Sequence, residues 1–179
     1  MIKQIAATQS KSPNGEIVEA VWWLQRWVSG SMRDSDWDES WITKIKTIED
    51  AFELLHLAVG NKQTKGKRLW RYLNVSTAYA KLLQRTLVLQ PTSDKYQSFT
   101  LTRKLAESLD LGRSGGVDVV ISCKPDSANV LFGWKDLEAS NDPAVRDSLL
   151  RLLDWKHQQE VIVRVTKPLP ILELHVLGS

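Results

Sequence analysis

One stretch of the chain lacks acidic residues altogether. Residues 54–93 contain no aspartate and no glutamate. Their basic residues are Lys62, Lys65, Lys67, Arg68, Arg71, Lys81 and Arg85. Residues 1–53 carry a net charge of −3 and residues 94–179 a net charge of −1, so the positive excess of the whole chain, +3, comes from this stretch. A local field of one sign attracts polyanions or an acidic partner.

Cysteine and long apolar runs are also scarce. The single cysteine, Cys123, excludes a disulfide within the chain, and a reducing cytoplasm is the simpler setting for such a protein. No apolar run approaches the roughly 18 residues that a membrane-spanning helix needs. The first residues, MIKQIAATQSKSPNG, lack the apolar core of a signal peptide. These absences predict a globular cytoplasmic protein without a membrane partner.

Motifs that carry catalysis are missing as well. The chain contains no glycine-rich phosphate loop, no zinc-protease motif and no nucleophile elbow. His56, His157 and His175 are its only histidines, and none has a partner at the spacing of a metal site or a catalytic triad. Cys123 is predicted to be a buried or idle thiol. We therefore expect no catalytic residue, metal or cofactor, although an enzyme whose site is assembled from distant residues stays a third hypothesis.

Apolar residues recur at helical spacing through the first part of the chain. Residues 16–28 place Ile17, Val21, Leu24 and Val28 on one side of a helix. A second helix is predicted from about Ser40 to Val59, where apolar residues step by four and three and Gly60 ends the pattern. A fourth helix is predicted over residues 101–110.

The third predicted helix runs from about Lys67 to Gln90 and ends before Pro91. One row of this helix is mostly apolar: Leu69, Leu73, Ser76, Ala80, Leu83 and Leu87. A second row, shifted by two residues, contains the basic side chains Lys67, Arg71, Lys81 and Arg85. Two residues correspond to roughly 200° of helical rotation. The helix is therefore predicted to bury Leu83 and to present Lys81 to solvent or a ligand.

The pattern changes after Gly112. Residues 117–123 and 129–134 are predicted strands that form a hairpin, and Asp142-Pro143 is a good start for a helix. Residues 161–165 and 172–176 are two further predicted strands. The expected fold is α+β, with a four-helix region over residues 1–112 and a β-β-α-β-β region over residues 113–179. The two regions form either separate domains or one shared core.

The segment from Leu101 to Ser114 resembles the first helix and turn of a helix-turn-helix protein, through Leu105-Ala106, Leu109, Leu111 and Arg113-Ser114. The resemblance implies a recognition helix that begins at about Ser114 and enters the major groove. The sequence departs from the family there, because Gly115 and Gly116 are poor helix formers and residues 117–121 are typical of a strand. A connection from helix to strand through the glycines is the favoured interpretation.

Tryptophan is abundant, with eight residues in the chain. Five of them lie in one segment: Trp22, Trp23, Trp27, Trp37 and Trp41. Adjacent residues point about 100° apart on a helix, so Trp22 and Trp23 cannot both face one core equally. The interpretations are core packing and, for at least one ring of the Trp22, Trp23 and Trp27 region, contact with a partner protein.

The basic stretch carries the functional hypothesis. Lysine and arginine without nearby acids neutralise phosphates and release counterions, and Trp70 could stack on a base or on an arginine. The predicted nucleic-acid-binding residues are Lys62, Lys65, Lys67, Arg68, Trp70, Arg71, Lys81 and Arg85. The first hypothesis is a non-catalytic subunit of a larger assembly that binds DNA or RNA. The alternatives are an adaptor whose basic helix docks on an acidic protein, and a helix face that only contacts solvent.

Overall fold

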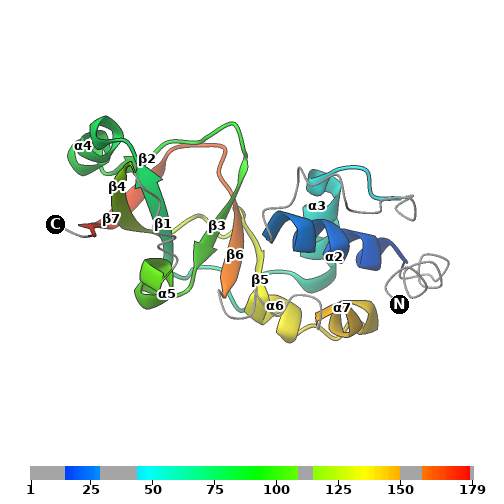
Figure 1. Cartoon of the computed structure of the whole chain (residues 1–179). Helices are drawn as coiled ribbons and strands as arrows, with labels where there is room; N and C mark the ends of the chain where they lie inside the picture. The colour runs from blue at the N-terminus through cyan, green and yellow to red at the C-terminus, as the bar shows by residue number, and fades with distance from the viewer. Residues whose placement is uncertain (1–14, 29–43, 109–114, 150–158, 178–179) are drawn as a thin grey trace. The chain divides into compact units, whose positions relative to one another are not determined.

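The computed structural model describes residues 15–28, 44–108, 115–149 and 159–177 (Figure 1). These residues pack into two units. Unit 1 contains residues 15–28, 44–61 and 134–149, and unit 2 contains residues 62–108, 115–133 and 159–177. The described residues combine helices with an antiparallel sheet, so the predicted α+β class is confirmed.

Unit 1 is built from helices α2 (Gly15–Val28), α3 (Ile48–Val59), α6 (Trp134–Glu138) and α7 (Pro143–Ser148). Helix α2 buries Ile17, Val21 and Leu24, as their spacing predicted. Helix α3 begins later than predicted, because Thr47 accepts a hydrogen bond from the backbone N–H of Asp50 and caps the helix at Ile48. The predicted start at Ser40 lies outside the described residues, and residues 44–47 are not helical.

The described tryptophans of α2 take part in packing within unit 1. Trp22 is buried and meets Trp23 edge to face, with 5.3 Å between ring centroids. Trp27 meets Phe52 of α3 in the same way at 5.4 Å, and Trp23 Nε1 donates to the carbonyl of Ile45 at 3.2 Å. Tryptophan pairs of this geometry stabilise beyond their buried area. Core packing is therefore confirmed for Trp22, whereas Trp23 and Trp27 are half-buried and contact of this region with a partner protein stays a prediction. Trp37 and Trp41 lie outside the described residues.

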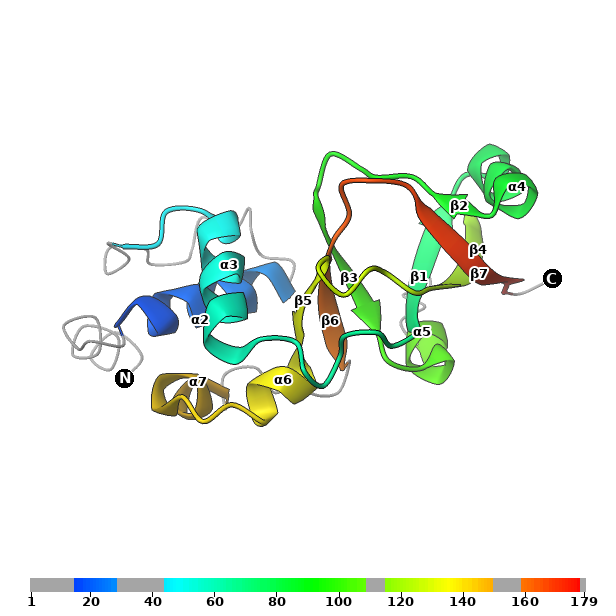
Figure 2. The same ribbon diagram turned by 180° about the vertical axis from the view of Figure 1, so that it is seen from behind.

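Unit 2 is a bent antiparallel sheet with two helices (Figures 1 and 2). Its strands are β1 (Leu69–Val75), β2 (Val88–Leu89), β3 (Tyr96–Thr100), β4 (Val117–Cys123), β5 (Val130–Gly133), β6 (Glu160–Arg164) and β7 (Leu169–Val176). Their order across the sheet is β2-β7-β4-β1-β3-β6-β5. The helices are α4 (Thr77–Thr86) and α5 (Arg103–Ser108).

The sheet bends where β1 meets β3, because only one residue pair, Trp70 with Thr100, joins the two strands. By contrast β1 and β4 are paired along all seven residues, from Leu69 with Cys123 to Val75 with Val117. The core lies inside the bend. It combines side chains from both parts of the sheet with two from α4, and includes Leu69, Ala80, Leu83, Phe99, Val119, Ile121, Val161 and Val163.

The prediction of one helix over residues 67–90 is wrong. Residues 69–75 form strand β1, and α4 begins only at Thr77, where the Ser76 side chain accepts from the backbone N–H of Tyr79. Leu87 then adopts a left-handed conformation (φ 49°) and ends the helix before β2. Residues 69–75 read equally well as L-W-R-Y-L-N-V, a half-buried strand with aromatic and branched side chains, and pairing with β4 selects that conformation.

Two related predictions also change. The helical region over residues 1–112 is not confirmed, because β1, β2 and β3 lie within it, and the division between the units does not follow the predicted boundary near residue 112. Strands β4 and β5 exist almost as predicted, but they do not form a hairpin. Strand β4 lies between β1 and β7, whereas β5 pairs with β6.

Several local predictions hold. The Asp142 carboxylate accepts from the backbone N–H groups of Ala144 and Val145 and caps α7, with Pro143 at its start. Strands β6 and β7 and helix α5 form close to their predicted residues. Gly115 and Gly116 lead into strand β4, so no recognition helix forms at residues 117–121. The predicted start of that helix at Ser114 and the rest of the connection from α5 lie outside the described residues. Among the described helices, none combines the length and apolarity that membrane crossing requires.

The two rows of the predicted helix are opposed on α4, although the helix is shorter. Leu83 is fully buried and Lys81 is exposed. Leu83→Ala should lower the free energy of unfolding by about 2–5 kcal/mol because it leaves a cavity in the core. The matched control Lys81→Ala should change it by about 0.5 kcal/mol or less. Chemical denaturation of both variants measures this, and a larger loss for Lys81→Ala than for Leu83→Ala would contradict the packing of α4.

Candidate nucleic-acid interface

The structure distributes the eight predicted binding residues over two sides of unit 2. Lys62, Lys65 and Lys67 are exposed in the turn before β1, which we call the lysine turn (residues 62–67). Lys81 and Arg85 are exposed on α4, which packs on the core side of the sheet through Ala80 and Leu83. The continuous basic row that the sequence predicted is therefore not formed.

Alternation along β1 places Trp70 and Arg71 on opposite faces of the sheet. Side chains of successive strand residues point to opposite faces of a sheet. Leu69 and Leu73 face the core, and Arg71 lies on their side, with its guanidinium 5.6 Å from the centre of the Phe99 ring. Trp70 is on the opposite face, which we call the polar face of the sheet. Its other polar members, from β1, β4 and β7, are Tyr72, Asn74, Asp118, Ser122, Glu173 and His175. The buried Val120 lies among them, between Tyr72 and His175.

Arg71 is held inside unit 2 and does not extend to a surface ligand. One of its terminal nitrogens donates to the carbonyl of Ser98 at 2.9 Å, and its Nε is buried without a hydrogen-bond partner among the described residues. Burial lowers the pKa of Arg71, while the charge of Glu160 raises it. Burial also raises the pKa of the neighbouring Cys123 thiol to about 12, so this cysteine is buried and un-ionised, as expected for an idle thiol.

Arg68 connects the lysine turn to the polar face. Its Nε donates to Ser122 Oγ at 2.9 Å, and a terminal nitrogen lies 2.5 Å from Glu173 Oε1. Its guanidinium also lies over the Trp70 ring, 5.0 Å from the centroid. Stacking on an arginine, one of the two roles predicted for Trp70, is therefore present in the structure. Trp70 also stacks on His175, with 6.2 Å between centroids and 28° between planes.

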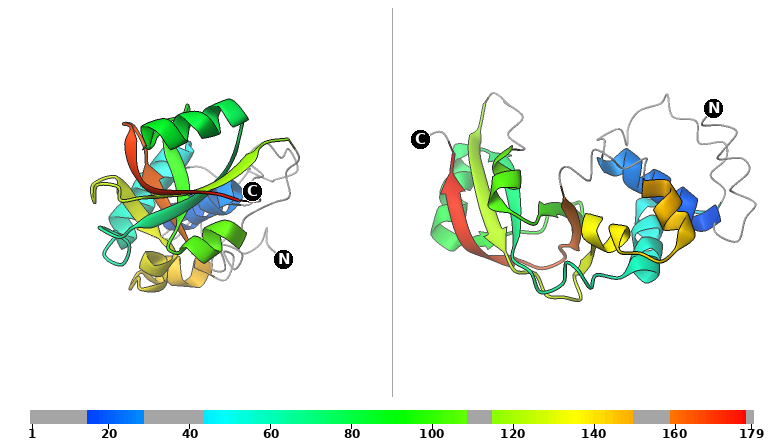
Figure 3. Two further views of the ribbon diagram at one scale, coloured as in Figure 1. Left: turned by 90° about the vertical axis from the view of Figure 1, so that its left-hand side faces the viewer. Right: turned by 90° about the horizontal axis from the view of Figure 1, so that it is seen from below.

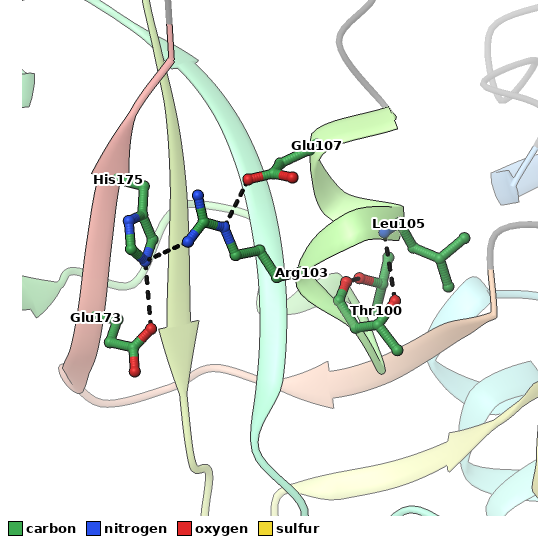
Figure 4. A network of polar contacts seen from close by, with 7 residues as sticks. Thr100, Arg103, Leu105, Glu107, Glu173 and His175 are labelled. Carbon is green, nitrogen blue, oxygen red and sulfur yellow. Dashed lines mark hydrogen bonds and ion pairs between the residues drawn. The ribbon is translucent and has the colours of Figure 1, made fainter.

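A second arginine completes the network on the polar face (Figure 4). Arg103, from the first turn of α5, lies 2.6 Å from Glu107 Oε1 and 3.4 Å from His175 Nε2. The same histidine nitrogen lies 3.2 Å from Glu173 Oε2. Figure 4 shows the ring of His175 between the two charged groups, with Arg103 reaching it from α5. The face thus joins residues that are about 70 positions apart in the sequence.

Sequence reasoning missed most of this face, although a signal was present. The signal was the predicted strand at residues 172–176, whose alternation places Glu173 and His175 on one face, and that strand does pair with β4, with His175 beside Val120. Lys124 was missed too. It follows Cys123, the last residue of β4, which pairs with Leu69, so register places exposed Lys124 next to Arg68. The basic end of the sheet therefore extends from the lysine turn to Lys124.

Asp118 forms a second polar cluster further along the same face. It accepts hydrogen bonds from Tyr72 Oη at 2.7 Å and from Asn74 Nδ2 at 2.6 Å. These two hydrogen bonds, the one from Asn74 first, lower the pKa of the Asp118 carboxyl group. These hydrogen bonds fix the side chains of Tyr72 and Asn74, so the phenol hydroxyl and the amide already have a partner within the face. Among the described residues, no three His, Cys, Asp or Glu side chains group as metal ligands would.

Comparisons with models of protein families, with curated proteins and with solved structures found no match to the chain.

Gly116 lies against Asn74 of the Asp118 cluster, so a side chain at this position would collide with the amide. A Cβ atom at Gly116 would lie 2.5 Å from Asn74 Oδ1, inside van der Waals contact. Gly116→Ala should therefore lower the free energy of unfolding by about 1–3 kcal/mol through overpacking. The cost should shrink in an Asn74→Ala background, where the clashing amide is absent. Urea unfolding of the two single variants and the double variant gives this coupling, and fully additive losses would show that Asn74 is not the group that is displaced.

The stability of unit 2 should depend on Glu173 at acid pH. Hydrogen bonding from His175, then from Arg68, lowers the pKa of Glu173. A carboxyl group with a lowered pKa in the folded state stabilises the protein fully above its ordinary pKa, and this contribution is lost as pH falls through the lowered value. Glu173→Gln should therefore make stability less sensitive to acid below the ordinary carboxyl range. Thermal unfolding at several pH values tests this, and parallel pH profiles for the variant and the wild type would exclude the proposed coupling.

Proposed function

We propose that unit 2 binds nucleic acid through its phosphate backbone at the basic end of the sheet. One observation carries the proposal: the residues of unit 2 include fourteen Lys and Arg against seven Asp and Glu, a formal net charge of +7, whereas unit 1 has ten against fourteen, or −4. The basic excess of the sequence is thus concentrated in one folded unit. Such a concentration is the electrostatic footprint typical of nucleic-acid-binding proteins.

The exposed lysines are the groups that contact phosphate in this proposal. Lys62, Lys65 and Lys67 lie within six residues of one turn, and Lys124 joins them across the strand pair. Each lysine is a flexible point charge that meets a phosphate without reading a base. Arg68 is already bound to Glu173 and Ser122, so we expect it to strengthen the field at this end of the sheet and to contribute less to direct contact.

Trp70 has a supporting role in this proposal. Arg68 and His175 both contact its ring, so a base could stack on it only by displacing one of them. We therefore expect Trp70→Ala to weaken binding indirectly, by releasing Arg68. Phosphate contact of this kind is the same for DNA and RNA, and we propose a non-catalytic role in a larger assembly, with a partner protein at the Trp22, Trp23 and Trp27 region.

The second candidate ligand for the same surface is an acidic protein. The contact between Arg68 and Glu173 supports it, because it shows that this end of the sheet already accommodates a carboxylate at hydrogen-bonding distance. The acidic composition of unit 1 supports it too, since the chain itself contains a segment of opposite charge. Phosphate and carboxylate ligands differ in how their binding depends on salt, and this difference separates the two candidates.

A pair of charge-matched double variants tests the nucleic-acid proposal. Lys65→Gln with Lys67→Gln removes two charges from the lysine turn, and Lys81→Gln with Arg85→Gln removes two from α4. The first pair should reduce the slope of log K against log salt by about 1.4–1.8, which is two phosphate contacts at about 0.7–0.9 each. The second pair should change the slope little, because α4 lies on the other side of the sheet. Fluorescence anisotropy with labelled oligonucleotides of about 20 nucleotides, single-stranded and duplex, measures both slopes.

If the two double variants reduced the salt slope equally, only the net charge of the protein would matter for binding, and the lysine turn would not be the site. If the wild type bound no oligonucleotide even at low salt, the nucleic-acid proposal would fall. Failure of the Lys65 and Lys67 double variant to assemble with its protein partner would then support the acidic-protein candidate. Circular dichroism of each variant shows whether it is folded.

A further inference from the structure

The two edges of the unit 2 sheet differ in how they are protected. At one edge all four residues of β5 are buried. At the other edge, β7 pairs with β2 only through Pro170 and Leu169, and no other described strand pairs with its outer side. Residues 172–177 are exposed or half-buried. Figure 3 shows β7 along the margin of unit 2, with β4 on its inner side.

Register identifies which backbone groups point outward from this edge. The N–H of Leu177 donates to the carbonyl of Asp118 on β4 at 2.8 Å. In an antiparallel pair the residues alternate between bonding to the partner and pointing away from it. His175 and Glu173 therefore bond to β4, whereas Val176 and Leu174 turn their N–H and C=O groups to the outer side. An extended chain could pair with these groups as an added strand.

Exposed apolar side chains gather beside the same edge. Among the described residues, four large hydrophobic side chains are exposed, and three of them belong to unit 2: Leu82 at 38%, Leu87 at 46% and Leu172 at 52%. Leu87 is where β2 meets β7, because its carbonyl accepts from the N–H of Ile171 at 2.8 Å. Leu172 is the next residue, and Leu82 lies one helical turn before Thr86, to which its carbonyl is bonded. Leu87 and Leu172 offer an added strand apolar contacts beside the start of β2.

The charges beside this edge are positive. Residues 76–93 contain Lys81 and Arg85 and no acidic residue, and both side chains are exposed on α4. Arg85 lies two residues before Leu87. The acidic residue of β7 itself, Glu173, projects to the polar face, where Arg68 and His175 bind it. Within residues 76–93 and strand β7, a chain added to this edge would therefore meet leucines and two cations, and the carboxylate of Glu173 is already bound on the polar face.

We propose that the outer edge of β7 is a docking site for an extended acidic segment of a partner protein, which adds a strand to the sheet. The partner pairs with the outward backbone groups of Leu174 and Val176. It places apolar side chains near Leu87 and Leu172 and carboxylates near Lys81 and Arg85. The site lies apart from the lysine turn and does not depend on nucleic-acid binding. Main-chain bonds supply affinity in this mode of recognition, and alternate side chains supply specificity.

The probe is an acetylated and amidated peptide of about eight residues, close to the length of a typical strand, with alternating glutamate and valine. It should bind the full chain, as measured by isothermal titration calorimetry. The same peptide with N-methyl groups on alternate backbone nitrogens should bind at least about tenfold more weakly, because the donors to the edge are removed. A peptide with lysine in place of glutamate should also bind at least about tenfold more weakly, because Lys81 and Arg85 would repel it.

Two protein variants locate the site. Val176→Pro removes an outward N–H while leaving the bonds to β4, since proline is accepted on edge strands, and it should weaken peptide binding at least about tenfold. Lys81→Gln with Arg85→Gln should weaken it several-fold and leave the salt dependence of oligonucleotide binding unchanged. If Val176→Pro fails to fold, the N-methylated peptide still tests backbone pairing on the wild-type protein.

The proposal is overturned if the N-methylated and unmodified peptides bind equally, because a strand addition needs the backbone donors. It is also overturned if folded Val176→Pro binds like the wild type, or if the wild type does not bind the peptide. Sedimentation velocity of the protein alone tests whether a second copy of this chain occupies the edge instead. A dimer that Val176→Pro abolishes would assign the edge to a second copy of this chain and would contradict an acidic partner.

Discussion

The pairing of β1 with β4 along seven residues is the interaction on which unit 2 depends. It places β1 near the middle of the sheet, so each of its side chains must face either the core or the polar face. Leu69 and Leu73 complete the core with Val119 and Ile121, while Trp70 meets His175 from β7. Because the two strands are separated by more than forty residues of sequence, this contact is made only when the chain has folded.

The same pairing decides what each basic residue can do. A helix would have presented Lys67, Arg71, Lys81 and Arg85 as one row. A strand followed by a capped helix instead leaves Lys67 in an exposed turn, turns Arg71 inward and carries Lys81 and Arg85 to the other side of the sheet. The basic excess still lies within one unit, because the formal net charge of unit 2 is +7. The two surfaces differ in chemistry. One combines lysines with a fixed arginine, and the other combines cations with exposed leucines and an edge of β7 that pairs with no described strand beyond β2.

Local signals in the sequence were reliable where the physical cause was local. The Asp142-Pro143 pair forms a helix cap because the carboxylate reaches backbone N–H groups only two and three residues away. The buried positions of α2 follow helical periodicity, and β4, β6 and β7 were recognisable from branched and alternating residues. Leu83 and Lys81 take opposed positions because α4 keeps the helical phase over that part of the segment. The α+β class was also predicted correctly, because it depends on which types of element form and not on how they pair.

The sequence by itself determined the charge excess, the apolar periods and the caps. Tertiary structure decided the conformation of residues 69–75, because a segment of tryptophan, tyrosine, leucine and valine can satisfy a helix or a strand until a partner strand supplies its backbone hydrogen bonds. It also decided strand order. Strands β4 and β5 are close in sequence, but β4 pairs with β1 and β7, whereas β5 pairs with β6. The Arg68, Trp70, Glu173 and His175 group could not be read from spacing, because the residues meet only through a sheet register that spans more than a hundred positions.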